Sequence, residues 1–124
     1  MQDGKYVILC IDDDEDVLEA LRLLLEANGY IMVGATTAEE GLKVCKESEP
    51  DLMIVDLMME EVDSGASFVR ELKATGTTAP IYILSSIGDS FYMSTDAAEL
   101  GLSGVFQKPI EPETLLAILK TKLK

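Results

Sequence analysis

The chain has 124 residues, the length of a single domain, and 48% of them are hydrophobic, which is enough for a buried core. Ten Lys and Arg residues stand against 23 Asp and Glu residues, and the net charge of −13 argues against direct binding to nucleic acid or to anionic membranes. Histidine is absent, which excludes histidine-based triads and metal sites, and no apolar run is long enough to span a membrane.

Strands and helices alternate along the first half of the chain. The strands are unbroken apolar runs, as in strands buried on both faces, and the helices carry apolar residues at helical spacing. A capping box and an Asn-Gly pair mark helix ends. The predicted elements are a strand at Tyr6–Ile11, a helix at Val17–Leu25 ended by Asn28-Gly29, a strand at Ile31–Ala35, a helix opened by Thr37-x-x-Glu40 and running to about Ser48, and a strand at Leu52–Val55.

The second half continues the same alternation. The predicted elements are a helix at Gly65–Ala74, a strand at Ile81–Leu84, a helix of weaker pattern at Ser90–Leu100, a strand at Gly104–Gln107 and a last helix with Pro112 in its first turn. Alternating strands and helices favour a parallel sheet with helices on both faces. We therefore expect an α/β fold of five strand–helix pairs, (βα)5, doubly wound and forming one domain over residues 1–124.

Two cysteines, Cys10 and Cys45, both lie in apolar contexts. Their spacing fits neither a zinc site nor a disulfide framework, so we interpret them as core residues of a protein from a reducing compartment. The expected location is the cytoplasm.

Polar side chains follow four of the five predicted strands. Asp12-Asp13 follows the first strand, Asp56 the third, Ser85 the fourth and Lys108 the fifth. A single Asp after a strand is commonly a turn or helix cap, but in a parallel sheet these four ends meet at one edge. Converging carboxylates repel one another unless a cation neutralises them, and oxygen-only ligands favour Mg²⁺. A lysine and a hydroxyl beside them suit a phosphoryl group.

The segments VILCIDDD, DLMIVDLM, PIYILSS, LGLSG and QKP occur in this order. Together they resemble the receiver domain of two-component response regulators, and the resemblance covers nearly the whole chain. It implies a flavodoxin-like five-stranded parallel sheet in the order 2-1-3-4-5. It also implies a phosphoacceptor carboxylate, a Mg²⁺ site and two residues that hold the phosphoryl group. The residues that match these roles are Asp56 as acceptor, Asp12, Asp13, Asp56 and the Met58 carbonyl as metal ligands, and Ser85 and Lys108 on the phosphoryl group, with Pro109 after a cis peptide bond.

The resemblance also implies partners. The donor would be a sensor histidine kinase or a phosphotransfer protein, and a downstream output domain or protein would respond to a switch at the surface of the fourth helix, fifth strand and fifth helix. Weak homodimerisation through that surface is a further expectation, and no direct contact with nucleic acid or membrane is expected. Turnover would be limited to phosphotransfer and dephosphorylation that the domain catalyses on itself, so we do not expect a conventional enzyme.

Three features depart from the family pattern. Glu60 stands where the family usually has proline, and the stretch from Asp56 to Gly65 is one residue longer than usual. Met58 and Ile87 are apolar at two positions that influence water access, so we hypothesise slow hydrolysis of the acyl phosphate. Val105 replaces the usual switching aromatic residue.

The sequence is also compatible with two other functions. Asp12-x-Asp14 after a strand also resembles haloacid-dehalogenase phosphatases, with Asp12 as nucleophile and Asp14 as acid/base, although Asp16 departs from that motif and Asp56 would have no role. The other is a degenerate receiver that only docks partners, which the unusual Asp56 loop would permit.

Overall fold

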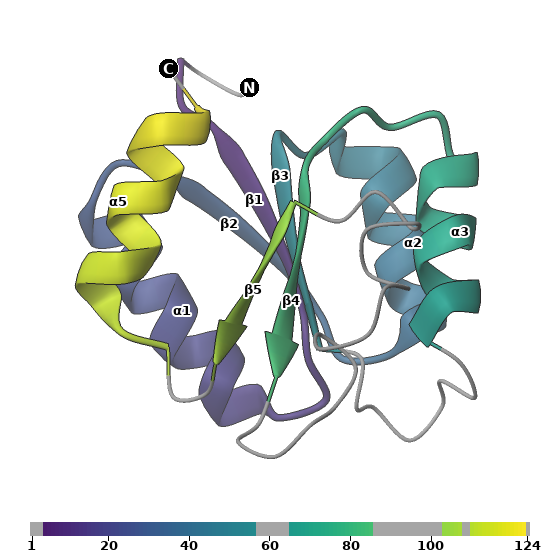
Figure 1. The fold of residues 1–124 in the computed structure, drawn as a ribbon, viewed down its shortest axis with the longest axis horizontal. Coiled ribbons are helices and arrows are strands. Elements are labelled where there is room, and N and C mark those ends of the chain that lie inside the picture. Colours follow the sequence, from purple (N-terminus) through teal and green to yellow (C-terminus); the bar gives the residue numbers. More distant parts are fainter. Residues whose placement is uncertain (1–3, 57–64, 86–102, 108–109, 124) are drawn as a thin grey trace.

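The computed structural model describes residues 4–56, 65–85, 103–107 and 110–123. In this part of the chain, strands and helices alternate as the sequence predicts, apart from the helix expected at Ser90–Leu100, which lies outside the described residues. Figure 1 shows their arrangement. The elements are β1 (Val7–Ile11), α1 (Glu15–Ala27), β2 (Ile31–Ala35), α2 (Ala38–Ser48), β3 (Leu52–Asp56), α3 (Gly65–Ala74), β4 (Ile81–Ser85), β5 (Gly104–Gln107) and α5 (Pro112–Lys122).

The described strands form one sheet in the order β2-β1-β3-β4-β5, with every pairing parallel. Helices α1 and α5 cover one face of this sheet, and α2 and α3 cover the other (Figure 1). The α/β architecture with a parallel sheet is thereby confirmed. None of the helices in the described ranges is both long and apolar enough to cross a membrane.

The core lies on both faces of the sheet, because successive side chains of a strand point to opposite sides. In β1, Ile8 and Cys10 belong to the cluster under α1 and α5, whereas Leu9 and Ile11 belong to the cluster under α2 and α3. All five β1 side chains are fully buried. This two-sided burial explains why the strands read as unbroken apolar runs.

Local caps fix both ends of α1, and the sequence predicts the one at Asn28-Gly29. Asp14 is the N-cap, and its Oδ1 accepts a hydrogen bond from the Asp16 amide at 2.9 Å. Asn28 is the C-cap, and Gly29 follows with φ of 87°, a left-handed conformation that glycine adopts without strain. Helix α1 thus starts directly after the loop that carries Asp12 and Asp13.

Helix α2 begins with the predicted capping box. The Glu40 amide donates to Thr37 Oγ1 at 3.0 Å, and Glu40 Oε1 accepts from the Thr36 amide at 2.8 Å. In the usual box the glutamate bonds the N-cap amide, whereas here it reaches one residue further back. The helix ends at Glu49, which adopts the left-handed conformation with φ of 46°.

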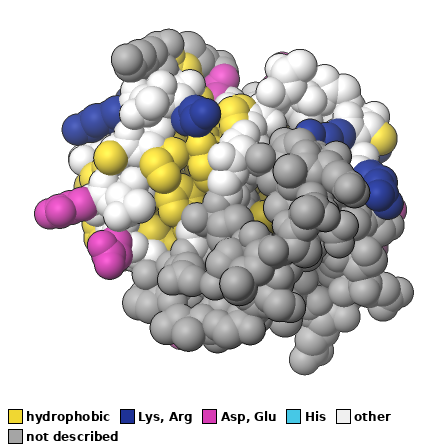
Figure 2. Space-filling model, in the orientation of Figure 1, with side chains coloured by type: hydrophobic (Ala, Val, Ile, Leu, Met, Phe, Trp, Pro, Cys, Tyr) yellow, Lys and Arg dark blue, Asp and Glu magenta, His cyan; other side chains and the backbone are white. Residues whose placement is uncertain are grey.

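Helix α5 has Pro112 in its first turn, as predicted, and basic residues Lys120 and Lys122 in its last turn. Basic charge at this end complements the helix dipole. Figure 2 shows hydrophobic side chains gathered along the inner side of α5, towards the strands. Leu115 and Leu119 are the fully buried members of this contact.

Candidate functional site

The carboxyl ends of β1 and β3 bring Asp12 and Asp56 together. These strands are neighbours, with Ile11 opposite Val55, so the next residue on each strand lies at the same edge. Asp56 is itself the last residue of β3, one residue beyond the predicted strand end. Asp12 follows β1 directly, and its amide donates to the Ala35 carbonyl at 3.0 Å, which extends the pairing with β2 by one bond.

Asp12, Asp13 and Asp56 form a cluster of three carboxylates. One oxygen from each of them lies within 4.8 Å of the other two. Asp12 is 0% exposed and Asp56 is 3% exposed, and they are the buried charged residues in the described part of the chain. Asp13 is exposed. Two carboxylates are therefore held in the protein interior, and the third faces solvent beside them.

The loop between β1 and α1 divides its acids between two tasks. Asp12 Oδ1 accepts a hydrogen bond from the Asp14 amide at 2.9 Å, which fixes the direction of the Asp12 side chain. Asp14, in contrast, caps α1 through its own side chain. The two residues predicted to carry chemistry, Asp12 and Asp13, are thereby separate from the residue that starts the helix.

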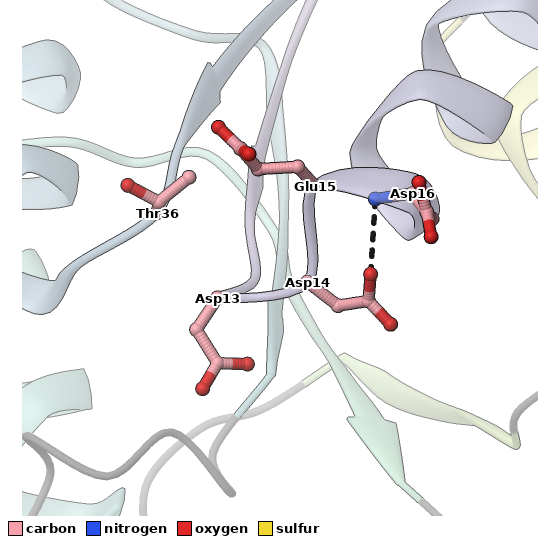
Figure 3. Close-up of a pocket in the computed structure, with 5 residues that line it drawn as sticks. All are labelled: Asp13, Asp14, Glu15, Asp16 and Thr36. Atoms are coloured by element: carbon pink, nitrogen blue, oxygen red, sulfur yellow. Dashed lines mark hydrogen bonds between the residues drawn. The ribbon is translucent and has the colours of Figure 1, made fainter.

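An open cavity of about 480 Å³ lies beside the cluster, lined by Asp13, Asp14, Glu15, Asp16 and Thr36 (Figure 3). In Figure 3 the Asp13 and Asp14 side chains project from the same stretch of loop, and Asp14 turns towards the first turn of α1. Thr36 reaches this cavity from the end of β2, a position that gave the weakest functional signal in the sequence. Its place after a strand in the same sheet was the signal that could have identified it.

The donor set suits a hard divalent cation. All three side chains offer carboxylate oxygens, and Mg²⁺ binds oxygen ligands through one or two carboxylates while retaining several waters. A cation there would also offset the mutual repulsion of carboxylates within 4.8 Å. The cluster therefore has the chemistry of a magnesium site.

The other predicted site residues are only partly described. Ser85 is the last residue of β4, which pairs with β3 and β5, so its backbone lies at the same edge of the sheet as Asp56. Strand β5 ends at Gln107, directly before Lys108. Lys108, Pro109 and Met58 lie outside the described residues, as do Glu60 and Ile87. The structure thus unites the three aspartates and the backbone of Ser85.

Comparison with known proteins places the chain in a family. The sequence-family model that describes the response regulator receiver domain matches residues 8–120 of this chain. The response regulator MprA of Mycobacterium leprae is 34% identical over 117 residues, which are 94% of this chain and 50% of that protein. The chain thus spans about half the length of this curated relative.

Two solved structures support the same assignment. A response regulator receiver domain protein from Clostridium thermocellum has a TM-score of 0.83 and 27% identity, covering 95% of this chain and 94% of that one. The chemotaxis protein CheY4 of Vibrio cholerae has a TM-score of 0.83 and 26% identity, covering 97% of this chain and all of the other, 100%. The chain therefore belongs to the response regulator receiver domains of two-component signalling.

Proposed function

We propose that Asp56 accepts a phosphoryl group from the phosphohistidine of a sensor histidine kinase or phosphotransfer protein. The observation that carries this proposal is the placement of Asp56, which is 3% exposed at the end of β3 with the carboxylates of Asp12 and Asp13 within 4.8 Å. A buried carboxylate among like charges has no packing role that an apolar residue would not fill better. The burial of Asp56 among other carboxylates therefore supports a chemical role for this side chain at the carboxyl edge of the sheet.

In the proposed transfer, a carboxylate oxygen of Asp56 attacks the phosphorus of the donor. The P–O bond forms as the P–N bond to the donor imidazole breaks, and the electron pair stays on the imidazole nitrogen, which takes a proton from water. Asp12, Asp13, Asp56 and the Met58 carbonyl would hold Mg²⁺, which supplies charge neutralisation between the phosphoryl group and the acceptor.

The second half of the chain would supply the remaining residues of the site and transmit its phosphorylation to the output surface. Ser85 would donate a hydrogen bond to the phosphoryl group, and Lys108, aimed by a cis bond before Pro109, would pair with its charge. The domain would span residues 1–124 as a (βα)5 unit, with a fourth helix between β4 and β5. Phosphorylation would shift the surface of that helix, β5 and α5 towards an output partner or a weak homodimer in the cytoplasm.

The direct test is the intact mass of the chain after incubation with acetyl phosphate, with and without Mg²⁺, beside the variant Asp56→Asn. We expect one added phosphoryl group that requires Mg²⁺, is released by alkali and is absent from Asp56→Asn. No adduct despite Mg²⁺ binding, with acetyl phosphate and with phosphohistidine donors, would contradict the proposal and favour a receiver that only docks partners. An added phosphoryl group that persists in Asp56→Asn and disappears in Asp12→Asn would favour a phosphatase of the haloacid-dehalogenase type, with Asp12 as nucleophile.

The lifetime of the adduct tests a narrower part of the proposal. Met58 and Ile87 are apolar at positions that would border the acyl phosphate, so water should reach the phosphorus slowly. Loss of the phosphoryl group can be followed by mass after the donor is removed. A half-life of only seconds would contradict slow hydrolysis without affecting the role of Asp56.

A further inference from the structure

Strand β2 forms an open edge of the sheet in the described part of the chain. In a parallel pair, alternate residues of a strand bond to the same neighbour. The Ile31 amide donates to the Tyr6 carbonyl, and the Ala35 carbonyl accepts from the Asp12 amide, so Ile31 and Ala35 face β1. The backbone groups of Met32 and Gly34 consequently point away from the sheet.

Two side chains cover the outward groups on either side of Gly34. Arg22 Nη1 donates to the Met32 carbonyl at 3.1 Å, and Glu40 Oε1 accepts from the Thr36 amide at 2.8 Å. Such covering is a common protection of sheet edges against pairing with another chain. Among the described residues, no side chain bonds the amide or carbonyl of Gly34. The protection therefore has a gap at Gly34, between the covered Met32 carbonyl and the covered Thr36 amide.

A groove of about 470 Å³ opens beside this gap, between Gly34 and α2. Its charged lining consists of Glu39, Glu40, Lys43 and Glu47, three carboxylates against one ammonium. The groove thus combines a backbone donor and acceptor with a negative wall. A second copy of this chain fits such a wall poorly, because each copy carries a net charge of −13.

We propose that the β2 edge is a docking site for an extended basic segment of a partner protein. The segment would pair with the amide and carbonyl of Gly34, and its alternate Lys or Arg side chains would lie against Glu39 and Glu47. Arg22 is able to give way, since its side chain is 41% exposed and its other bond is a 3.4 Å ion pair with Glu26. Its displacement would release the Met32 carbonyl for a third backbone bond.

The glycine provides a matched pair of variants. Gly34→Pro removes the outward amide hydrogen but leaves the pairing with β1 intact, and an edge strand tolerates proline in this orientation. Gly34→Ala keeps the amide. A Cβ at this position would meet Met32 Cε at 3.4 Å and Arg22 Nη2 at 3.8 Å, which are ordinary contacts.

The probe is a short acetylated peptide of alternating lysine and valine, titrated against the full chain by calorimetry. We expect Gly34→Pro to weaken binding about tenfold and Gly34→Ala to change it by less than about threefold. The same peptide with N-methyl groups on alternate amides should also lose binding to the wild-type chain. This measurement remains informative even if Gly34→Pro does not fold. The Gly34 amide resonance should shift on binding.

Four results would overturn the proposal. The first is no binding at about 1 mM peptide. The second is equal binding of the N-methylated peptide, which would indicate charge attraction alone. The third is an equal loss of affinity in Gly34→Pro and Gly34→Ala, and the fourth is self-association of the wild-type chain that Gly34→Pro abolishes. None of these readouts involves phosphorylation, so they are independent of the role proposed for Asp56.

Discussion

Asp13 has the exposed carboxylate of the site, and its charge opposes two buried ones. One of its oxygens lies within 4.8 Å of oxygens of Asp12 and Asp56. We expect Asp13→Asn to raise the free energy of unfolding without Mg²⁺ by on the order of 1 kcal/mol, because one repulsive charge is removed. Chemical denaturation monitored by circular dichroism measures this change.

The same variant should respond less to magnesium. At a Mg²⁺ concentration about a hundredfold above its dissociation constant, binding should stabilise the wild-type chain by about 2.7 kcal/mol, and Asp13→Asn should gain less. A variant that is less stable without Mg²⁺, yet gains as much from it as the wild-type chain, would contradict the placement of the cation. Thr37→Ser, a conservative change at the α2 cap, serves as the control.

Cys10 gives the protein a pH dependence at alkaline pH. Burial raises the pKa of its thiol from 9.0 to about 12, with Asp12 adding to the rise and Arg22 opposing it. Between these values the unfolded chain loses the thiol proton and the folded chain keeps it. The unfolded state then binds fewer protons, so the free energy of unfolding falls as pH rises through this range.

The comparison with Cys10→Ala isolates this effect. The difference in unfolding free energy between the wild-type chain and Cys10→Ala should shrink above pH 9, by up to about 1.4 kcal/mol per pH unit. Groups common to both proteins cancel in this difference. A difference that stays constant from pH 9 to about 11 would show that the folded thiol titrates normally.

At the scale of the element, the start of α2 packs tightly on the end of β1. A Cβ on Gly41 would lie 2.7 Å from Ile11 Cδ1 and 3.2 Å from its Cγ1, and Ile11 is fully buried. Gly→Ala inside a helix normally stabilises by about 1 kcal/mol, but overpacking costs about 1–3 kcal/mol. We therefore expect Gly41→Ala to destabilise the protein.

A double-mutant cycle tests this contact. Ile11→Val removes Cδ1, and in that background Gly41→Ala should be neutral or stabilising, with a coupling energy of about 1–2 kcal/mol. Urea unfolding of the four proteins supplies the values. Additive effects would mean that Ile11 moves aside freely and that Gly41 has no packing role.

Local sequence signals predict the elements well where the chemistry of their ends is local. The β5 and α3 bounds agree with the prediction, and so do the C-cap of α1 and the capping box of α2. Local signals fail to predict an element's end where that end depends on a residue distant in the sequence. Asp56 belongs to β3 because β4 pairs with it, and Glu49 takes a left-handed conformation that glycine or asparagine more often adopts.

At the scale of the whole molecule, the sequence predicts the site through topology. Buried runs on both faces imply a parallel sheet, and a parallel sheet places Asp12, Asp13 and Asp56 at one edge. Sequence alone could not show which carboxylates are buried or that Thr36 lines the adjoining cavity. Both depend on the side-by-side placement of β1, β2 and β3, which no local pattern encodes.

We propose that the carboxyl edge of the sheet is a phosphoacceptor centre with Asp56 as the acceptor. Borohydride reduction of the chain phosphorylated in Mg²⁺ converts an aspartyl phosphate into homoserine, which peptide mass mapping locates. We expect homoserine at position 56 alone. Homoserine at position 12 or 13, with position 56 unmodified, would contradict this proposal.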